Sequence, residues 1–299
     1  MAIHLVRPAD VDDPARPSGG NVYDRRIASA LGLVEHSSIA TVPDGALVLL
    51  DGLLTSSDLI ADASRVRLVV LVHLPRWEPW EGPLLRAVAG VIATSRWTRD
   101  ELVERYGLER VFVAEPGVDP APCSVGSPSG GALLSVGAVT RLKGYDVLAA
   151  ALASLSDLDW TCRGVGSVEI EPDFASSLPP VVRLSGAMAR ADLDATYAEA
   201  DLLVLASRAE TYGMVVTEAL ARGVPVVASD VGGVREALGG GGVLVPVGDA
   251  DALGAALRAW LTSPSHRSGL RAAARTRRAE LTGWDRTAAL VSDALEAVR

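Results

Sequence analysis

Two glutamates, Glu210 and Glu218, lie in a segment whose pattern is typical of a strand, a polar loop and a helix. The predicted strand ends at Ala206, Glu210 lies on the loop, and Gly213 opens a helix that runs to about Arg222. The first N–H groups of a helix lack partners within it, so this helix offers a seat for an anionic diphosphate. Glu218 can accept two hydrogen bonds from vicinal hydroxyls such as those of a ribose, and Glu210 can accept hydroxyls of a second ring.

The alternative interpretation is that Glu218 only complements the positive end of the helix and that Glu210 is a solvated loop charge. A strand pattern, Gly223-Val-Pro-Val-Val, follows the helix at once. This continuation favours the interpretation as a site over the two isolated charges.

A second loop carries two cations, Arg141 and Lys143, between a strand that ends at Gly137 and a helix that begins near Gly144. Arginine offers a planar fork and lysine a movable point charge, which suits two adjacent phosphates. Fixed cations here would stabilise a diphosphate as it leaves. Two solvated cations before a helix are the alternative, but Lys143 is the only lysine among 28 lysines and arginines. That exception favours a phosphate role.

These two segments resemble the donor-binding half of the family 4 retaining glycosyltransferases, which have the GT-B fold. The motif E-x7-E is matched by Glu210 and Glu218, and the motif Gly-x5-Lys-Gly is matched from Gly137 to Gly144. The resemblance covers nearly all of residues 131–299.

The resemblance implies a role for each matched position. Arg141 and Lys143 would grip the diphosphate, and Glu218 would hold the ribose. Glu210 would hold the donor sugar together with the backbone of the next segment, which contains Tyr212, Gly213, Met214 and Val215. The turn at Gly186 and Met188 would line the base pocket.

The first half of the chain resembles the family more loosely. The segment Pro17-Ser-Gly19-Gly20-Asn21 is similar to the family's first loop, where two glycines approach the donor phosphate and the acceptor. Asn21 is alternatively only the N-cap of a helix. His73 ends a predicted strand where the family often has a histidine near the reacting end of the sugar, and a structural histidine is the alternative. Arg96 is a further candidate to reach the site.

Short apolar runs alternate with helical patterns along the whole chain, which is typical of parallel βαβ architecture. The runs read as continuous Val, Leu and Ile blocks, as expected of strands that are buried on both faces. The predicted strands are Ile3–Val6, Ala46–Leu50, Leu68–Val72, Gly90–Thr94, Arg110–Ala114, Ala132–Val136, Asp159–Arg163, Val181–Leu184, Leu202–Leu205, Val224–Ala228 and Gly242–Val245.

We therefore expect an α/β fold of two Rossmann-like domains facing each other across a cleft, as in the GT-B type. The N-terminal domain is expected to span residues 1–118 and to be shortened, because only about a dozen residues separate its first helix from the strand at Ala46. The Pro-, Gly- and Ser-rich residues 119–131 should not pack and should form a linker. Residues 132–283 form the nucleotide-sugar domain, and a helix over 284–299 packs back on the first domain.

Composition excludes several other functions. A formal charge of −9 argues against nucleic acid. Cys123 and Cys162 show neither disulfide nor zinc spacing. The N-terminus is too interrupted for a signal peptide, and no run reaches the roughly 20 apolar residues that a membrane span needs. These features predict a cytoplasmic protein without a transmembrane segment.

The predicted activity is retaining transfer of a sugar from a nucleotide-diphosphate sugar to an acceptor hydroxyl of a small molecule or glycan. No metal and no cofactor are expected, because the loop cations and the helix N-terminus stabilise the leaving charge. One alternative is an impaired, nucleotide-sugar-binding accessory protein, which the shortened first domain suggests. A dinucleotide-dependent oxidoreductase is disfavoured, since Gly164-Val-Gly166-Ser-Val-Glu lacks the third glycine of G-x-G-x-x-G. The donor base, the acceptor and the oligomeric state are left open.

Overall fold

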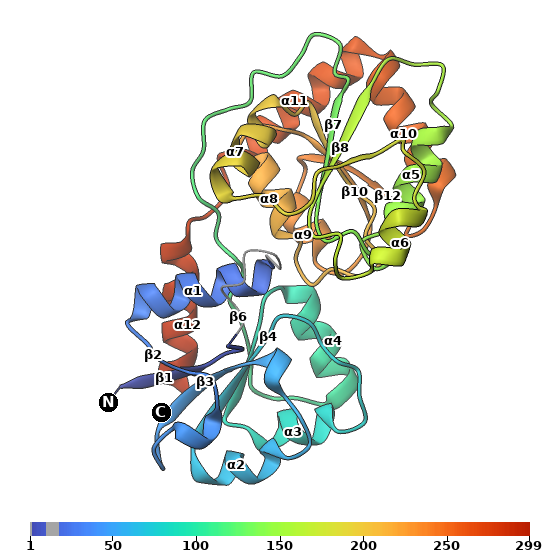
Figure 1. The fold of residues 1–299 in the computed structure, drawn as a ribbon. Helices are drawn as coiled ribbons and strands as arrows, with labels where there is room; N and C mark the ends of the chain where they lie inside the picture. The colour runs from blue at the N-terminus through green and yellow to red at the C-terminus, as the bar shows by residue number, and fades with distance from the viewer. Residues whose placement is uncertain (1, 10–17) are drawn as a thin grey trace. The chain divides into compact units, whose positions relative to one another are not determined.

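The computed structural model describes residues 2–9 and 18–299, which divide into two compact units. The first unit contains the described residues up to Gly117 together with Thr282–Arg299. The second unit contains Val118–Leu281. Each unit is an α/β structure built on one parallel sheet of six strands (Figure 1).

The first sheet has the strand order β2-β1-β3-β4-β5-β6, and every pairing in it is parallel. Its strands are β1 Ile3–Val6, β2 Val34–His36, β3 Leu47–Asp51, β4 Arg67–Val72, β5 Gly90–Ala93 and β6 Val111–Val113. Its helices are α1 Gly19–Leu31, α2 Leu59–Arg65, α3 Glu81–Ala87, α4 Arg96–Tyr106 and α12 Trp284–Ala297, with 3-10 turns at Ile39–Thr41 and Gly52–Leu54.

The second sheet has the order β12-β11-β10-β7-β8-β9 and is also parallel. Its strands are β7 Ala132–Val136, β8 Thr161–Val165, β9 Arg183–Leu184, β10 Leu202–Leu205, β11 Val226–Ser229 and β12 Gly242–Val245. Its helices are α5 Tyr145–Ala153, α6 Pro172–Ser177, α7 Arg190–Glu199, α8 Met214–Leu220, α9 Val234–Leu238, α10 Ala250–Thr262 and α11 Pro264–Arg278.

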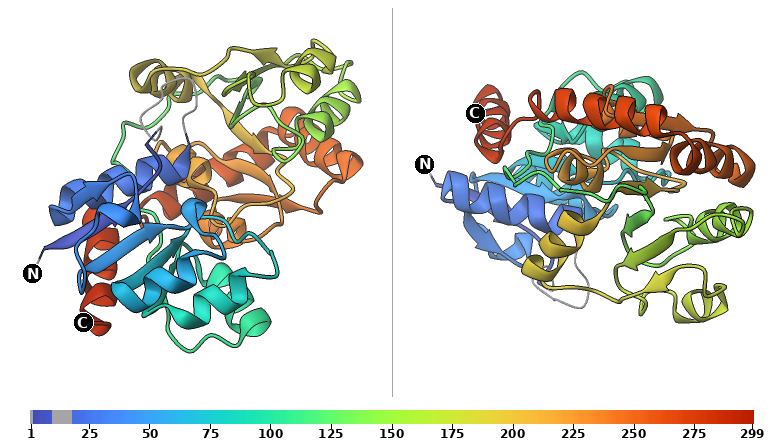
Figure 2. Two further views of the ribbon diagram at one scale, coloured as in Figure 1. Left: turned by 60° about the horizontal axis from the view of Figure 1, so that its bottom comes forward. Right: turned by 90° about the horizontal axis from the view of Figure 1, so that it is seen from above.

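Helices cover both faces of each sheet, which explains why the strands read as unbroken apolar runs (Figure 2). In β3, Leu47 and Leu49 pack in one cluster with helices α1 and α12. The alternate residues Val48 and Leu50 pack in another cluster with helices α2, α3 and α4. The same division holds in the second unit, where α5, α6 and α10 cover one face and α7, α8, α9 and α11 the other. The expected Rossmann-like α/β fold is confirmed.

The structure contains every strand expected from the sequence and adds β2. This three-residue edge strand contains Glu35 and His36, so it lacks the apolar run that marks the other strands. It pairs with β1 only, and Val34 in it is exposed. The space between the first helix and β3 is therefore occupied by a strand and a 3-10 turn, and the first sheet has as many strands as the second.

The Pro- and Ser-rich segment over residues 119–131 packs on the second unit, so the expectation that its composition prevents packing is wrong. The Ser127 hydroxyl donates to Asp201 Oδ2 at 2.6 Å, and the Trp260 indole donates to the Gly130 carbonyl at 2.7 Å. Polar side chains supply the contacts that an apolar segment would make by burial. Among the described residues, no helix combines the length and the apolar character needed to cross a membrane.

Candidate functional site

The loops after β7 and β10 meet in the second unit, because these strands are neighbours in its sheet. Lys143 Nζ lies 2.6 Å from Glu210 Oε1, and the two side chains are 29 % and 13 % exposed. The Ser207 hydroxyl donates to the same oxygen at 2.9 Å. The structure thus brings together one residue from each of the two motifs.

Two glycines make this meeting sterically possible. Gly144 has a φ of +69°, and a Cβ there would lie 1.9 Å from the carbonyl oxygen of Ala206, so only glycine fits. Gly137 has a φ of +150°, a backbone conformation that residues with a side chain rarely adopt, and a Cβ there would make ordinary contact with the Lys143 side chain at 3.6 Å. The loop that holds Lys143 is therefore fixed by backbone contact with the end of β10.

Glu218 on α8 is bound by two side chains of α7. Arg190 Nη1 donates to Glu218 Oε1 at 2.8 Å, and the Tyr197 hydroxyl donates to Oε2 at 3.0 Å. Burial raises the pKa of Tyr197 well above its ordinary value, and the charge of Glu218 raises it further, so the hydroxyl keeps its proton. Sequence reasoning missed both partners, because the pairing depends on how α7 and α8 pack.

Helix α8 begins at Met214, directly after Gly213, whose φ is +94°. It ends at Leu220, slightly before the predicted end. Tyr212 is buried, whereas Met214 and Val215 in the first turn are half-buried. The backbone segment proposed to face a donor sugar is therefore placed between the Glu210 loop and the Glu218 turn of the helix.

Arg141 does not join the Lys143–Glu210 pair. Its guanidinium lies 4.8 Å from the centroid of the Phe174 ring on α6, and its backbone N–H donates to Glu171. Its proposed contact with a diphosphate stays a prediction.

The predicted base-pocket turn lies after β9. Gly186 has a φ of +69°, and its carbonyl accepts from the Gly166 N–H at 2.9 Å. The sulfur of Met188 accepts from the Thr196 hydroxyl at 3.6 Å. These contacts fix the turn but assign it no ligand.

Arg208 is a structural residue of this region that sequence reasoning missed. It donates to both carboxylate oxygens of Asp146 at 2.8 Å and to the carbonyl of Arg141. Hydrogen bonding from Arg208 lowers the pKa of Asp146. This residue ties the loop after β10 to the loop after β7.

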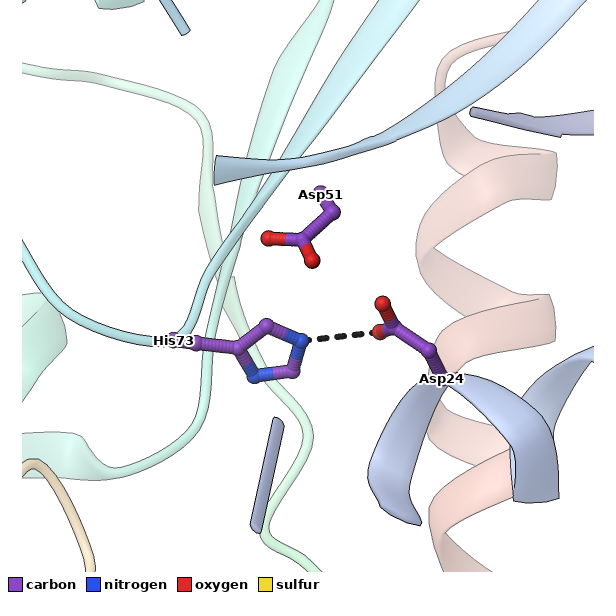
Figure 3. A group of neighbouring side chains, drawn as sticks. All are labelled: Asp24, Asp51 and His73. Carbon is purple, nitrogen blue, oxygen red and sulfur yellow. Dashed lines mark hydrogen bonds and ion pairs between the residues drawn. The ribbon is translucent and has the colours of Figure 1, made fainter. Parts of the chain in front are cut away.

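In the first unit, His73 lies beside two carboxylates that the sequence did not single out (Figure 3). Asp24 comes from α1, Asp51 ends β3, and His73 directly follows β4. His73 Nε2 and Asp24 Oδ1 are 2.8 Å apart, and one ligand atom from each of the three residues lies within 4.8 Å of the others. Among residues 2–9 and 18–299, these three side chains form a group that could transfer a proton or hold a metal ion.

The two glycines of the predicted first loop form the start of α1. Gly19 is its first residue, and a Cβ on Gly20 would lie 3.3 Å from the His73 ring. The helix is capped by Ser18, whose Oγ accepts from the Asn21 N–H at 3.1 Å, so the interpretation of Asn21 as the N-cap is wrong. Pro17 of the same motif lies outside the described residues.

The last candidate, Arg96, starts α4 and is largely exposed. Its Nη2 lies 3.5 Å from Glu115 Oε1 in the same unit.

Comparison with known proteins places this geometry in a family. The profile described as "Glycosyl transferases group 1" matches residues 130–263. The chain is 34 % identical over 254 residues to D-inositol 3-phosphate glycosyltransferase 1 of Catenulispora acidiphila, an alignment that covers 73 % of this chain and 60 % of the relative. The protein of that name from Kineococcus radiotolerans is also 34 % identical, over 70 % of this chain and 57 % of its own length. The chain thus spans about 60 % of the length of these relatives.

Solved structures match over the full chain. Anabaena Alr3699/HepE in complex with UDP-glucose has a TM-score of 0.79 and 18 % identity, covering 99 % of this chain and 100 % of that one. A glycosyltransferase from Rickettsia africae has a TM-score of 0.72 and 17 % identity, covering 100 % and 98 %. The GT-B fold and the resemblance to family 4 glycosyltransferases are confirmed. Residues 130–263 belong to the group 1 glycosyltransferase family.

Proposed function

We propose that this chain is a glycosyltransferase that moves a sugar from a nucleotide-diphosphate sugar to an acceptor hydroxyl, with retention and without a metal. The observation that carries the proposal is the Lys143–Glu210 pair, at the carboxyl ends of two adjacent parallel strands. Ligands of doubly wound sheets bind at this end of the strands. A cation and an acceptor side by side suit a phosphate that is linked to a sugar.

In the proposed complex, Lys143 binds the diphosphate and Glu210 accepts hydroxyls of the donor sugar. Glu218 accepts the hydroxyls of the ribose, which requires its bonds to Arg190 and Tyr197 to be exchanged or shared. Both acceptors are partly exposed, so the exchange needs no opening of the core. Arg141 moves from its place on Phe174 to the phosphates.

In the proposed reaction, the proton passes directly from the acceptor to the leaving group. The acceptor oxygen attacks the anomeric carbon on the face from which the diphosphate departs, and the sugar–phosphate bond breaks. The acceptor proton passes to the leaving phosphate oxygen, so no protein nucleophile is needed. Lys143 stabilises the charge that develops on this leaving group. In the first unit, His73 is the candidate for a role in transfer because of the resemblance to family 4.

The ligands and names of the similar proteins indicate which substrates to test first. Anabaena Alr3699/HepE is described in complex with UDP and with UDP-glucose, and the curated relatives are named for D-inositol 3-phosphate. We take UDP-sugars as the first donors to test and a small hydroxylated molecule or a glycan as the acceptor. The expected cytoplasmic location stays a prediction.

The alternative of an impaired accessory protein depended on a shortened first domain. That domain has a complete sheet of six parallel strands, because β2 fills the space that the sequence left empty. The stretch between α1 and β3 is still short, but a complete sheet favours the transferase over the accessory protein.

Donor binding and transfer test the proposal together. Calorimetry with UDP-, GDP- and ADP-sugars identifies the donor, mass spectrometry detects the transfer product, and NMR of its anomeric carbon reports retention. Lys143→Ala and Glu210→Ala should each lower kcat by about 100-fold or more, and Lys143→Arg should recover part of it. EDTA should leave the rate unchanged. Arg258→Ala, which breaks an exposed pair with Asp157, is the matched control. Wild-type turnover in both Lys143→Ala and Glu210→Ala would refute the proposal.

A further inference from the structure

The cluster of Asp24, Asp51 and His73 poses a problem of buried charge. Both aspartates are 0 % exposed. Asp24 uses Oδ1 for His73, and Asp51 uses Oδ1 to accept from the Leu53 N–H at 2.8 Å. The second oxygen of each, Oδ2, is buried without a partner among the described residues. Two ionised carboxylates this close in the interior need a compensating charge or proton.

The local electrostatics distribute protons among the three groups. Burial raises the pKa of Asp51 to about 6, against the opposing charge of His73 and with help from Asp24. For His73, burial alone would lower the pKa, but the hydrogen bond and charge of Asp24, with the charge of Asp51, outweigh it and raise the pKa. Burial raises the pKa of neighbouring Tyr23 far above its usual range, so it stays neutral. Below about pH 6, the raised pKa of Asp51 and the raised pKa of His73 keep a proton on each of these two groups.

We propose that Asp24 and Asp51 are positioning residues for His73. Asp24 accepts from His73 Nε2–H, and Asp51 shares a proton with Asp24. Together they hold His73 in one orientation as an imidazolium that stabilises negative charge on a bound substrate. This inference rests on the proposed function for the identity of that substrate, a nucleotide-diphosphate sugar.

The surroundings of the ring support one fixed orientation. The Tyr23 ring meets the His73 ring edge-on, with centroids 5.3 Å apart. Gly20 lies against the ring, where a Cβ would be at 3.3 Å. Together with Asp24 at Nε2, three residues of α1 therefore lie next to the imidazole.

A divalent cation bound by the same three residues is the competing account. The ligand atoms are close enough for one. However, Nε2 of His73 already lies at hydrogen-bond distance from Asp24, and two protons leave the cluster neutral. We take protons as the account to test because they need no further ligand, and the cation becomes an outcome of the test.

NMR of the full chain with ¹⁵N-labelled histidine tests the proposal, because the chain has only four histidines. The ring nitrogen signals that disappear in the His73→Gln variant are assigned to His73. We expect the wild-type His73 to remain protonated above its ordinary pKa. Asp24→Asn should lower this pKa by about one unit or more, since the partner loses its charge. Asp51→Asn should shift it less and carries the test if Asp24→Asn does not fold. Asp157→Asn, an exposed carboxylate of the second unit, should leave it unchanged.

The same variants separate positioning from a purely structural role. In Asp24→Asn, the fall in kcat at high pH should begin at a lower pH than in the wild type, because His73 loses its proton earlier. The KM for the donor should change less than kcat. Identical His73 titration in wild type, Asp24→Asn and Asp51→Asn would overturn the proposal. So would one equivalent of a divalent cation in the purified protein that is lost in Asp24→Asn. The titration needs no donor, so a shifted His73 in a protein without transfer activity refutes the proposed function and leaves the proton assignment intact.

Discussion

The two units hold their candidate groups in opposite ways. In the second unit, Glu210 and Glu218 are partly exposed and are each bound by a cation, Lys143 and Arg190. In the first unit, Asp24 and Asp51 are fully buried and both lie close to His73. Partly exposed ion pairs exchange partners at little cost, whereas buried carboxylates keep their arrangement. The comparison indicates that the ion pairs of the second unit can be replaced by contacts with a ligand. The buried carboxylates of the first unit instead keep the His73 side chain in place.

The largest effect should come from removing the close approach of the two loops in the second unit. Gly144→Ala would place a Cβ 1.9 Å from a backbone oxygen at a φ of +69°, so we expect a loss of about 3 kcal/mol or more in unfolding free energy. Gly186→Ala is the control, because it has the same φ and nothing within 4 Å; it should cost about 1 kcal/mol. Equal denaturation midpoints for the two variants would show that the loops do not depend on this contact.

The next effect concerns exchange at Glu218. Glu218→Gln should raise the donor KM about 10-fold with little change in kcat, because the lost contact forms before the transition state. Tyr197→Phe removes one of the two hydrogen bonds that compete with the donor for Glu218. The donor KM of this variant should therefore lie below that of Glu218→Gln. Steady-state kinetics with the donor found by calorimetry measures both. A kcat loss without a KM change would place Glu218 in the chemical step instead.

A smaller effect should appear in the pH dependence of stability, which we expect to differ between the two units. The folded-state pKa of Asp51 is raised to about 6, so its contribution to stability falls as the pH rises from its unfolded pKa to that value. The raised pKa of His73 adds stability below pH 6.5 that is lost as the pH rises through the folded pKa. The lowered pKa of Asp146 adds stability that is complete above its unfolded pKa, so it does not change in this range.

From pH 5 to pH 8, the melting temperature of the first unit should therefore fall by on the order of 5 °C, as measured by calorimetry. Asp51→Asn should reduce the fall. Asp157→Asn should not. A melting temperature that rises over this range would contradict the assignment of protons to the cluster.

The smallest effect should arise at the exposed pairs of the second unit. Arg208→Lys removes the bidentate contact with Asp146 and should cost about 1 kcal/mol. Arg258→Lys changes a similar bidentate contact to Asp157, far less connected to the loops, and should cost less. Urea denaturation measures the unfolding free energy of both variants. A larger loss in Arg208→Lys than in Arg258→Lys would show that Arg208 stabilises the two loops.

The fold was predictable because its strands are buried on both faces and so leave unbroken apolar runs. The missing element, β2, is short, polar and at an edge, where burial leaves no such pattern. The linker was misjudged because Ser127 and Gly130 find partners on distant elements. Local composition carries no information about those partners.

The candidate site was predictable only in part. Lys143 and Glu210 stand out by residue type and by their place after strands. Asp24 has no such mark, because a carboxylate inside Tyr23-Asp24-Arg25 reads as the polar face of a helix. Asp51 did carry a signal, since it directly follows four apolar residues at the carboxyl end of a strand. Arg190 and Tyr197 become partners of Glu218 only through the packing of α7 on α8.

The return of α12 to the first unit has a consequence for synthesis on the ribosome. Ala288, Val291 and Leu295 of this helix are part of the same core as Tyr23 and Ile27 of α1. That core stays open until α12 emerges, while all of Val118–Leu281 is already available to fold. The unit whose translation starts first is therefore completed only after the whole second unit has been made, and until then a nascent chain exposes the apolar face of α1.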